Sequence, residues 1–138
     1  MTRLRSRYHL NILNAECKRF SDVATRKIQK LGKVTNVNAD RDYLHENIQN
    51  YDVLVVAIKN LIDSKLLKVA KKLKVIVTPT TGLNHIDLIA AKEQQIKVLS
   101  LKGEVNFLRT VSATAEHTWG LLLCLQRKIW LAHNHVLS

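Results

Sequence analysis

The sequence contains few of the residues that build metal centres or base-stacking surfaces. Its two cysteines, Cys17 and Cys124, lie far apart in the chain and fit no metal-binding or redox spacing. We expect both to be reduced thiols in a cytoplasmic protein. His133 and His135 provide two possible metal ligands without a third, so no metal site is expected there. Aromatic residues make up only 5% of the chain, which leaves few platforms for stacking nucleic-acid bases.

Long apolar segments are also missing. The charged first eight residues are not followed by the apolar stretch of a signal peptide. The longest apolar run, 119–125, is much shorter than the roughly 20 residues of a membrane span. These two features predict a cytoplasmic protein without a membrane partner.

Acidic residues are scarce relative to basic ones. The chain has 22 Lys and Arg against 11 Asp and Glu, a net charge of +11, which raises nucleic acid as a possible partner. The basic residues are spread along the chain, however, and only Arg3, Arg5 and Arg7 resemble a binding arm. One group falls on a single face of an expected helix, opposite its leucines: Lys65, Lys68, Lys71 and Lys72. A solvated helix face explains this pattern better than a nucleic-acid surface.

Short apolar runs alternate with helical patterns through the first hundred residues. The expected strands are 8–13, 33–38, 52–58, 75–78 and 97–100. The expected helices between them are 21–31, 42–50, 63–73 and 87–95. Ser21 and Asp63 are expected to cap two of these helices, and Gly32 to end the first. The continuous apolar runs at 52–58 and 75–78 are typical of strands buried on both faces.

This alternation predicts an α/β fold: a flavodoxin-like, doubly wound parallel sheet of five strands. Ligands of such sheets bind outside the carboxyl ends of the strands, which here lead into 57–60, 79–84 and 100–104.

The last part of the sequence differs, because a long C-terminal helix is expected from about Thr114 to His133. Apolar residues cover all its sides, whereas a surface helix keeps one polar face. We therefore expect it to be buried from two directions, by the sheet and by a second domain or subunit. The predicted organisation is a substrate-binding domain at 1–113 and an interdomain or oligomerisation helix at 114–138.

Three stretches carry a resemblance to a known family. They are LKVIVTPTTGLNHIDLIAA at 73–91, IKVLS at 96–100 and SATAEHTWGLLL at 112–123, followed by RKI at 127–129. In this order they resemble the N-terminal substrate-binding (catalytic) domain of the D-isomer-specific 2-hydroxyacid dehydrogenases, which are phosphoglycerate-dehydrogenase-like. The resemblance extends from about Tyr51 to Ile129 and is weaker before that.

The resemblance implies hydride exchange between NAD and a small 2-hydroxy or 2-keto acid. It implies that the Gly82 and Leu83 amides hold the substrate carboxylate and that Thr81 touches the cofactor. Backbone N–H groups at a strand end, followed by a helix N-terminus, suit an anion, and Gly82 allows close approach. The family often has an Arg after the third strand. This chain has Ala57 and Ile58 there, so Lys59 is the candidate cation, without the bidentate fork of an arginine.

The sequence also lacks a nucleotide-binding motif. Its four glycines do not form the G-x-G-x-x-G that cradles a pyrophosphate. By resemblance, that motif and the catalytic Arg, Glu and His follow the long helix, so no residue here is assigned a catalytic role. The expected function is therefore the substrate-binding domain or a truncated fragment of an NAD-dependent dehydrogenase, inactive alone.

Two other functions share features with this sequence. The chain could be a non-catalytic interaction module that forms a homo-oligomer through its last helix. A phosphate-accepting receiver domain shares the fold class, but it needs acidic residues after its first and third strands. The third strand here leads into Ala57, Ile58 and Lys59, and neither alanine nor lysine can ligate magnesium.

Overall fold

The structure is a computed structural model that describes residues 10–137. The described residues form two compact units, which divide after Lys102. The basic group Arg3, Arg5 and Arg7 and the predicted beginning of the first strand lie outside the described residues. The predicted boundary after residue 113 separates a substrate-binding part of the chain from an interdomain or oligomerisation helix. That functional division stays a prediction.

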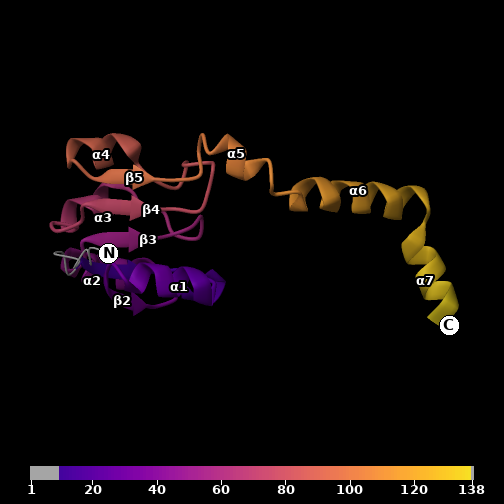
Figure 1. The fold of residues 1–138 in the computed structure, drawn as a ribbon, viewed down its shortest axis with the longest axis horizontal. Helices are drawn as coiled ribbons and strands as arrows, with labels where there is room; N and C mark the ends of the chain where they lie inside the picture. Colours follow the sequence, from indigo (N-terminus) through magenta and orange to yellow (C-terminus); the bar gives the residue numbers. More distant parts are fainter. Residues whose placement is uncertain (1–9, 138) are drawn as a thin grey trace, which may run out of the picture. The chain divides into compact units, whose positions relative to one another are not determined.

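The first unit is built on a five-stranded parallel sheet. Its strands are β1 (Leu10–Asn14), β2 (Gly32–Asn36), β3 (Val53–Val55), β4 (Val75–Val77) and β5 (Lys97–Leu99). They are arranged in the order β2-β1-β3-β4-β5 (Figure 1). Every neighbouring pair is parallel. This arrangement confirms the predicted doubly wound α/β fold class.

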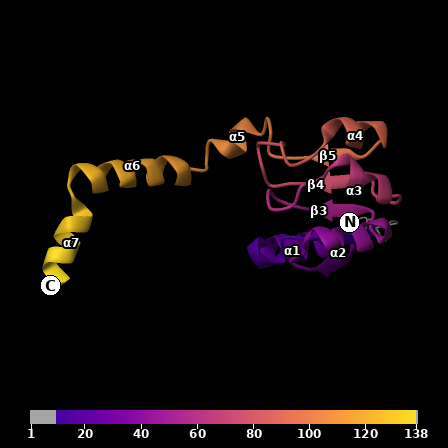
Figure 2. The ribbon, with the colours of Figure 1, turned by 180° about the vertical axis from the view of Figure 1, so that it is seen from behind.

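Helices connect the strands. They are α1 (Asp22–Gln29), α2 (Arg41–Asn47), α3 (Ser64–Val69) and α4 (Leu88–Glu93), with short 3₁₀ turns η1 (Cys17–Arg19) and η2 (Ile48–Asn50). Helix α3 contacts both α2 and α4, so these three form one layer (Figure 2). The main core lies between this layer and the sheet, around Leu54, Ile76 and Leu66.

The two faces of the sheet are not equally covered. Leu54 and Ile76 are fully buried under the helical layer. Their strand neighbours Val53, Val75 and Val77 point to the opposite face and are only partly buried. The expectation that these strands are buried on both faces is therefore wrong at these positions.

Side-chain caps define where the helices begin. Ser21 accepts a hydrogen bond from the Ala24 N–H at 3.2 Å, and Asp63 accepts one from the Leu66 N–H at 2.9 Å, as predicted. Gly32, however, does not end a helix. It is the first residue of β2, where a Cβ atom would lie 2.0 Å from the Leu10 carbonyl oxygen. The close backbone approach explains why this position is glycine.

The second unit contains only helices: α5 (Val105–Leu108), α6 (Ala113–Gln126) and α7 (Ile129–Leu137). The single helix expected at 114–133 is thus interrupted. Helix α6 ends at Gln126, and Lys128 adopts a left-handed conformation with φ of 51°. Neither glycine nor proline marks this break, so no local signal predicts it. Within residues 10–137, no helix is sufficiently long and apolar to cross a bilayer.

Candidate functional site

The loop between β4 and α4, residues 78–87, lies at the carboxyl edge of the sheet. Two backbone hydrogen bonds hold its turns. The Leu101 N–H donates to the Thr80 carbonyl at 3.1 Å, which ties the loop to the segment after β5. The Ile86 N–H donates to the Leu83 carbonyl at 2.9 Å, which closes a turn. Hydrogen bonds therefore hold the backbone of this loop, although the loop belongs to no strand or helix.

A second anchor connects this loop to the segment after β3. The Ile62 N–H donates to the His85 carbonyl at 2.7 Å, and the Asp87 N–H donates to the Ile62 carbonyl at 2.8 Å. These bonds form a parallel bridge between Ile62 and Ile86. The two loops that follow β3 and β4 are thereby held side by side.

Six consecutive backbone N–H groups of this loop have no acceptor. Among residues 10–137, none of the N–H groups of residues 80–85 donates a recorded hydrogen bond. Gly82 adds room, because a Cβ atom built on it would meet nothing within 4 Å. Free amides in a rigid turn can receive an anion.

Side chains behind the loop form a continuous row of hydrogen bonds. The Thr80 hydroxyl donates to the Gly82 carbonyl at 2.8 Å. The Thr78 and Thr80 hydroxyl oxygens are 3.0 Å apart, and the Thr78 oxygen is 3.3 Å from His85 Nε2. We call Thr78, Thr80 and His85 the threonine–histidine relay.

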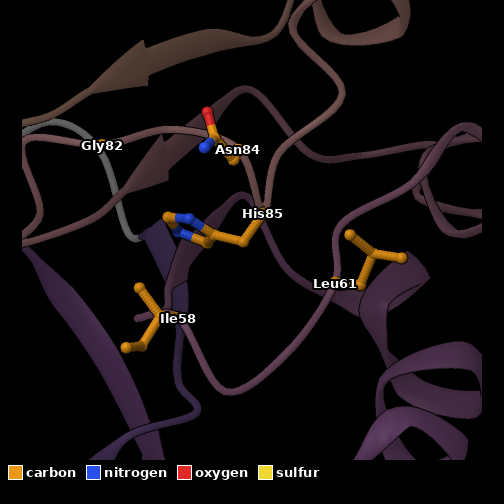
Figure 3. A pocket seen from close by; sticks show the side chains of 5 residues that line it. All are labelled: Ile58, Leu61, Gly82, Asn84 and His85. Atoms are coloured by element: carbon orange, nitrogen blue, oxygen red, sulfur yellow. The ribbon is translucent and has the colours of Figure 1, made fainter.

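A pocket of about 400 Å³ opens beside the loop. It is lined by Ile58, Leu61, Gly82, Asn84 and His85. Figure 3 shows that Ile58 and Leu61 come from the segment after β3, and the other three residues from the loop after β4. Its walls are therefore mostly apolar, with the Gly82 backbone, the His85 ring and the Asn84 amide as polar groups.

Lys59 lies apart from this pocket. Its ammonium donates to the Ala39 carbonyl at 3.2 Å and to Asn38 Oδ1 at 3.4 Å. It lines a different cavity of about 270 Å³, together with Glu16, Lys18 and Asn38. The structure thus does not bring Lys59 and Gly82 into one pocket, although Ile58 precedes Lys59 in the chain.

The other predicted site residues are placed as follows. Thr81 is exposed next to Gly82, and Leu83 is partly buried against the core. The helix N-terminus expected to assist the loop is further away, since α4 begins only at Leu88. Its first turn is already capped, because the Asp87 carboxylate accepts from the Ala90 N–H at 2.9 Å. An anion here would depend on the loop amides instead.

Sequence reasoning missed the relay. Thr78, Thr80 and His85 all lie within the stretch 73–91 that carries the resemblance, but the sequence assigns none of them a role. A signal was present: residues two apart in an extended segment point to the same side, as Thr78 and Thr80 do.

Metal ligands and thiols add no further site. Within residues 10–137, no three His, Cys, Asp or Glu side chains lie close enough to hold a metal ion. Cys17 is partly buried and Cys124 is exposed, and both are free thiols.

Burial lowers the pKa of His85, because the charged imidazolium would lose its hydration. The pKa in the folded chain is then below the ordinary value of 6.5. As the pH falls below that value, the unfolded chain takes up the proton first, so the free energy of unfolding decreases. We expect the variant His85→Gln, which cannot titrate, to lose less stability than the wild type between about pH 7.5 and about pH 5.

Urea unfolding at these two pH values measures the difference. His45→Gln serves as the control, because it removes a histidine outside the loop. If the wild type and His85→Gln lost the same free energy on acidification, the burial argument for His85 would be wrong.

Comparisons with known proteins confirm the predicted resemblance. Residues 7–125 match the family described as "D-isomer specific 2-hydroxyacid dehydrogenase, catalytic domain". The chain is 34% identical over 97 residues to hydroxypyruvate reductase of Thermotoga maritima, covering 70% of this chain and 30% of that protein. It is 34% identical over 96 residues to D-3-phosphoglycerate dehydrogenase of Archaeoglobus fulgidus, covering 70% of this chain and 17% of that protein.

A solved structure supports the fold. The D-lactate dehydrogenase of Aquifex aeolicus, solved in complex with NAD and lactic acid, superposes with a TM-score of 0.72. The superposition covers 91% of this chain and 36% of that one, at 19% identity. The chain therefore spans about a third or less of the length of these three proteins.

Proposed function

This chain belongs to the D-isomer specific 2-hydroxyacid dehydrogenase family, and on that premise we propose that it binds the substrate of such an enzyme. The substrate is a small 2-hydroxy acid or the corresponding 2-keto acid. The loop after β4 holds its carboxylate through the Gly82 and Leu83 amides. The adjoining pocket of about 400 Å³ receives the rest of the molecule.

The free amides of residues 80–85 are the observation that carries this proposal. A carboxylate carries a full negative charge and accepts several hydrogen bonds, and N–H groups in a rigid loop donate them without first breaking bonds of their own. The mostly apolar pocket lining suits a short carbon chain. Ile58, Leu61 and Asn84 would then contact the substrate side chain.

NAD supplies or accepts the hydride in the proposed reaction. The glycines of this chain do not form its pyrophosphate cradle, because Gly32 is in β2 and Gly120 is within α6. Gly103 occupies a turn with φ of 91°, and after Glu104 only the four-residue helix α5 follows. We therefore assign no step of hydride transfer to these residues and propose only that Thr81 borders the cofactor.

Lys59 remains the proposed source of a second positive charge. Its ammonium now contacts Asn38 and Ala39, so reaching the substrate requires a side-chain rotation. A substrate with a second anionic group would gain most from this positive charge.

A cytoplasmic location of the protein stays a prediction.

Binding of oxamate, an unreactive analogue of a 2-keto acid, tests this function. We expect Gly82→Ala to weaken oxamate binding about tenfold, a loss of about 1.4 kcal/mol, because the new methyl group occupies the space of the carboxylate. The melting temperature should not fall, since that methyl group meets nothing within 4 Å. Gly120→Ala is the matched control, because its Cβ is equally unobstructed and lies in α6. Equal oxamate affinity in all three proteins would contradict the proposal.

A second proposed function is self-association through α6 and α7. Large apolar side chains of both helices are exposed, including Trp119 at 63%, Leu125 at 70% and Trp130 at 57%. Large apolar surfaces that are exposed on a protein often mark an interaction site. The same surface would serve the alternative interaction module and a dehydrogenase homo-oligomer.

We expect light scattering to show a mass that rises with concentration. The double variant Leu125→Glu with Trp130→Glu should move this rise to concentrations at least about tenfold higher, because it places charges in the apolar surface. Val23→Glu, at an exposed position of α1, is the control. A wild-type mass that stays monomeric at every concentration would contradict self-association.

A further inference from the structure

The donors and acceptors of the threonine–histidine relay can be assigned in only one way that satisfies every member. The Gly82 carbonyl can only accept, so the Thr80 hydroxyl uses its single proton for it. Thr80 must then accept from Thr78 across their 3.0 Å contact. Thr78 has now used its own proton, so it accepts from His85 Nε2–H at 3.3 Å. The direction of the row therefore runs from His85 to Gly82.

This direction fixes the tautomer of His85. The ring must carry its proton on Nε2, which leaves Nδ1 without one in the neutral form. Thr78 is 2% exposed and His85 is 9% exposed, so little water can compete for these bonds. The Thr78 backbone is itself held, because its N–H donates to the Leu99 carbonyl at 2.9 Å. The middle member of the relay is thus tied to the end of β5.

The far end of the relay sets the orientation of one peptide group. The Gly82 carbonyl and the Leu83 N–H belong to the same planar trans peptide, so they point in opposite directions. When Thr80 binds the carbonyl, the Leu83 N–H must point away from Thr80. The turn closed by the Ile86 N–H and the Leu83 carbonyl fixes the next peptide in the same way. Without the relay, the Gly82–Leu83 peptide would be free to rotate, since Gly82 tolerates many conformations.

We propose that Thr78, Thr80 and His85 are positioning residues that hold the Gly82–Leu83 peptide with its N–H directed at the substrate carboxylate. This inference rests on the proposed function for the choice of ligand. The orientation of the peptide itself does not depend on it. None of the three side chains is assigned contact with the reacting atoms.

The tautomer is tested first, on the ¹⁵N-labelled 138-residue chain at neutral pH. Two-bond ¹H–¹⁵N correlation spectra distinguish a protonated ring nitrogen from an unprotonated one. We expect His85 to be protonated on Nε2 alone. Protonation on Nδ1 alone would overturn the relay, because Nε2 would then accept from Thr78, and the one remaining hydroxyl proton could not serve both the Thr78–Thr80 contact and the Gly82 carbonyl.

The positioning role is tested with three variants and oxamate. Thr80→Val removes the hydroxyl at constant shape and is expected to weaken oxamate binding about three- to tenfold, the effect of one hydrogen bond. It should also shift the Leu83 amide resonance before any ligand is added. Thr80→Ser keeps the hydroxyl and should restore both. His85→Gln retains a donor near the position of Nε2 and should therefore weaken oxamate binding less than Thr80→Val does.

The results separate the relay from the proposed function. If Thr80→Val left both the Leu83 resonance and oxamate affinity unchanged, the relay would have no positioning role. If Thr80→Ser failed as badly as Thr80→Val, packing and not the hydroxyl would be responsible, which also overturns the inference. If the wild type bound no oxamate, the proposed function would fall. The tautomer and the Leu83 resonance of Thr80→Val would still decide whether the relay orients the peptide.

Discussion

The 138-residue chain alone is expected to catalyse no measurable reduction of a 2-keto acid by NADH. Hydride transfer requires the nicotinamide to be held against the substrate, and none of the four glycines of this chain builds the loop that binds a dinucleotide pyrophosphate. A general acid is also required to protonate the reduced carbonyl oxygen. Of the side chains that line the pocket, only the His85 ring titrates, and its Nε2 proton is engaged with Thr78.

Loss of the characteristic absorbance of NADH measures this directly. Glyoxylate, hydroxypyruvate and pyruvate should be tried separately, with a complete D-2-hydroxyacid dehydrogenase as the positive control. The expected rate is that of the buffer. A rate that rises in proportion to the purified chain, and that persists through repeated purification, would show that these residues bind NADH and complete a catalytic site.

The largest effect on stability is expected from Gly32→Ala. The added Cβ would lie 2.0 Å from the Leu10 carbonyl oxygen and 2.8 Å from the Leu10 nitrogen, and both are backbone atoms. Leu10 and Gly32 are register partners in the β1–β2 pair, so the clash can be relieved only by separating the strands. We expect a loss of about 3 kcal/mol or more in the free energy of unfolding.

Urea unfolding followed by circular dichroism measures this loss. Lys33→Ala is the matched control, because its side chain is exposed in the same strand and it should change stability by less than about 0.5 kcal/mol. A Gly32→Ala variant as stable as Lys33→Ala would show that β1 and β2 are further apart at this end than the structure has them.

Most of the sheet could be predicted from sequence because β1, β3, β4 and β5 contain short apolar runs next to helices with side-chain caps. Ser21 and Asp63 indicated the beginnings of two helices, and the alternation of strand and helix patterns indicated the number of strands. The uneven cover of the sheet could not be predicted. The residue type does not reveal how far a side chain is buried, so a half-buried valine such as Val75 cannot be told from a fully buried one.

The C-terminal helices show a second limit of sequence reasoning. The break at Lys128 depends on a left-handed backbone conformation that lysine seldom adopts. No glycine or asparagine, which favour this conformation, stands at the break. The apolar residues around α6 predicted burial. Among residues 10–137, however, all side chains of α6 and α7 are exposed. The light-scattering experiment tests whether a second copy of the chain covers them.

The position of the candidate site in the fold could be predicted, but its side-chain contacts could not. The resemblance indicates Gly82 and Leu83, and the fold places their loop at the expected edge of the sheet. Lys59 is the predicted cation because it follows β3. The direction of a side chain does not follow from its position in the chain, however, and the Lys59 ammonium contacts Asn38 and Ala39. The relay depends on three hydroxyl and ring atoms that meet only when the loop has folded back toward β4.

The central claim is that the Gly82 and Leu83 amides bind the carboxylate of a 2-hydroxy or 2-keto acid. The most direct measurement is a titration of the ¹⁵N-labelled chain with oxamate, followed through its backbone amide resonances. The account predicts a saturable shift of the Gly82 and Leu83 resonances, larger than that of any amide in α6 or α7. Saturable shifts confined to residues near Lys18 and Lys59, with Gly82 and Leu83 unmoved, would contradict it.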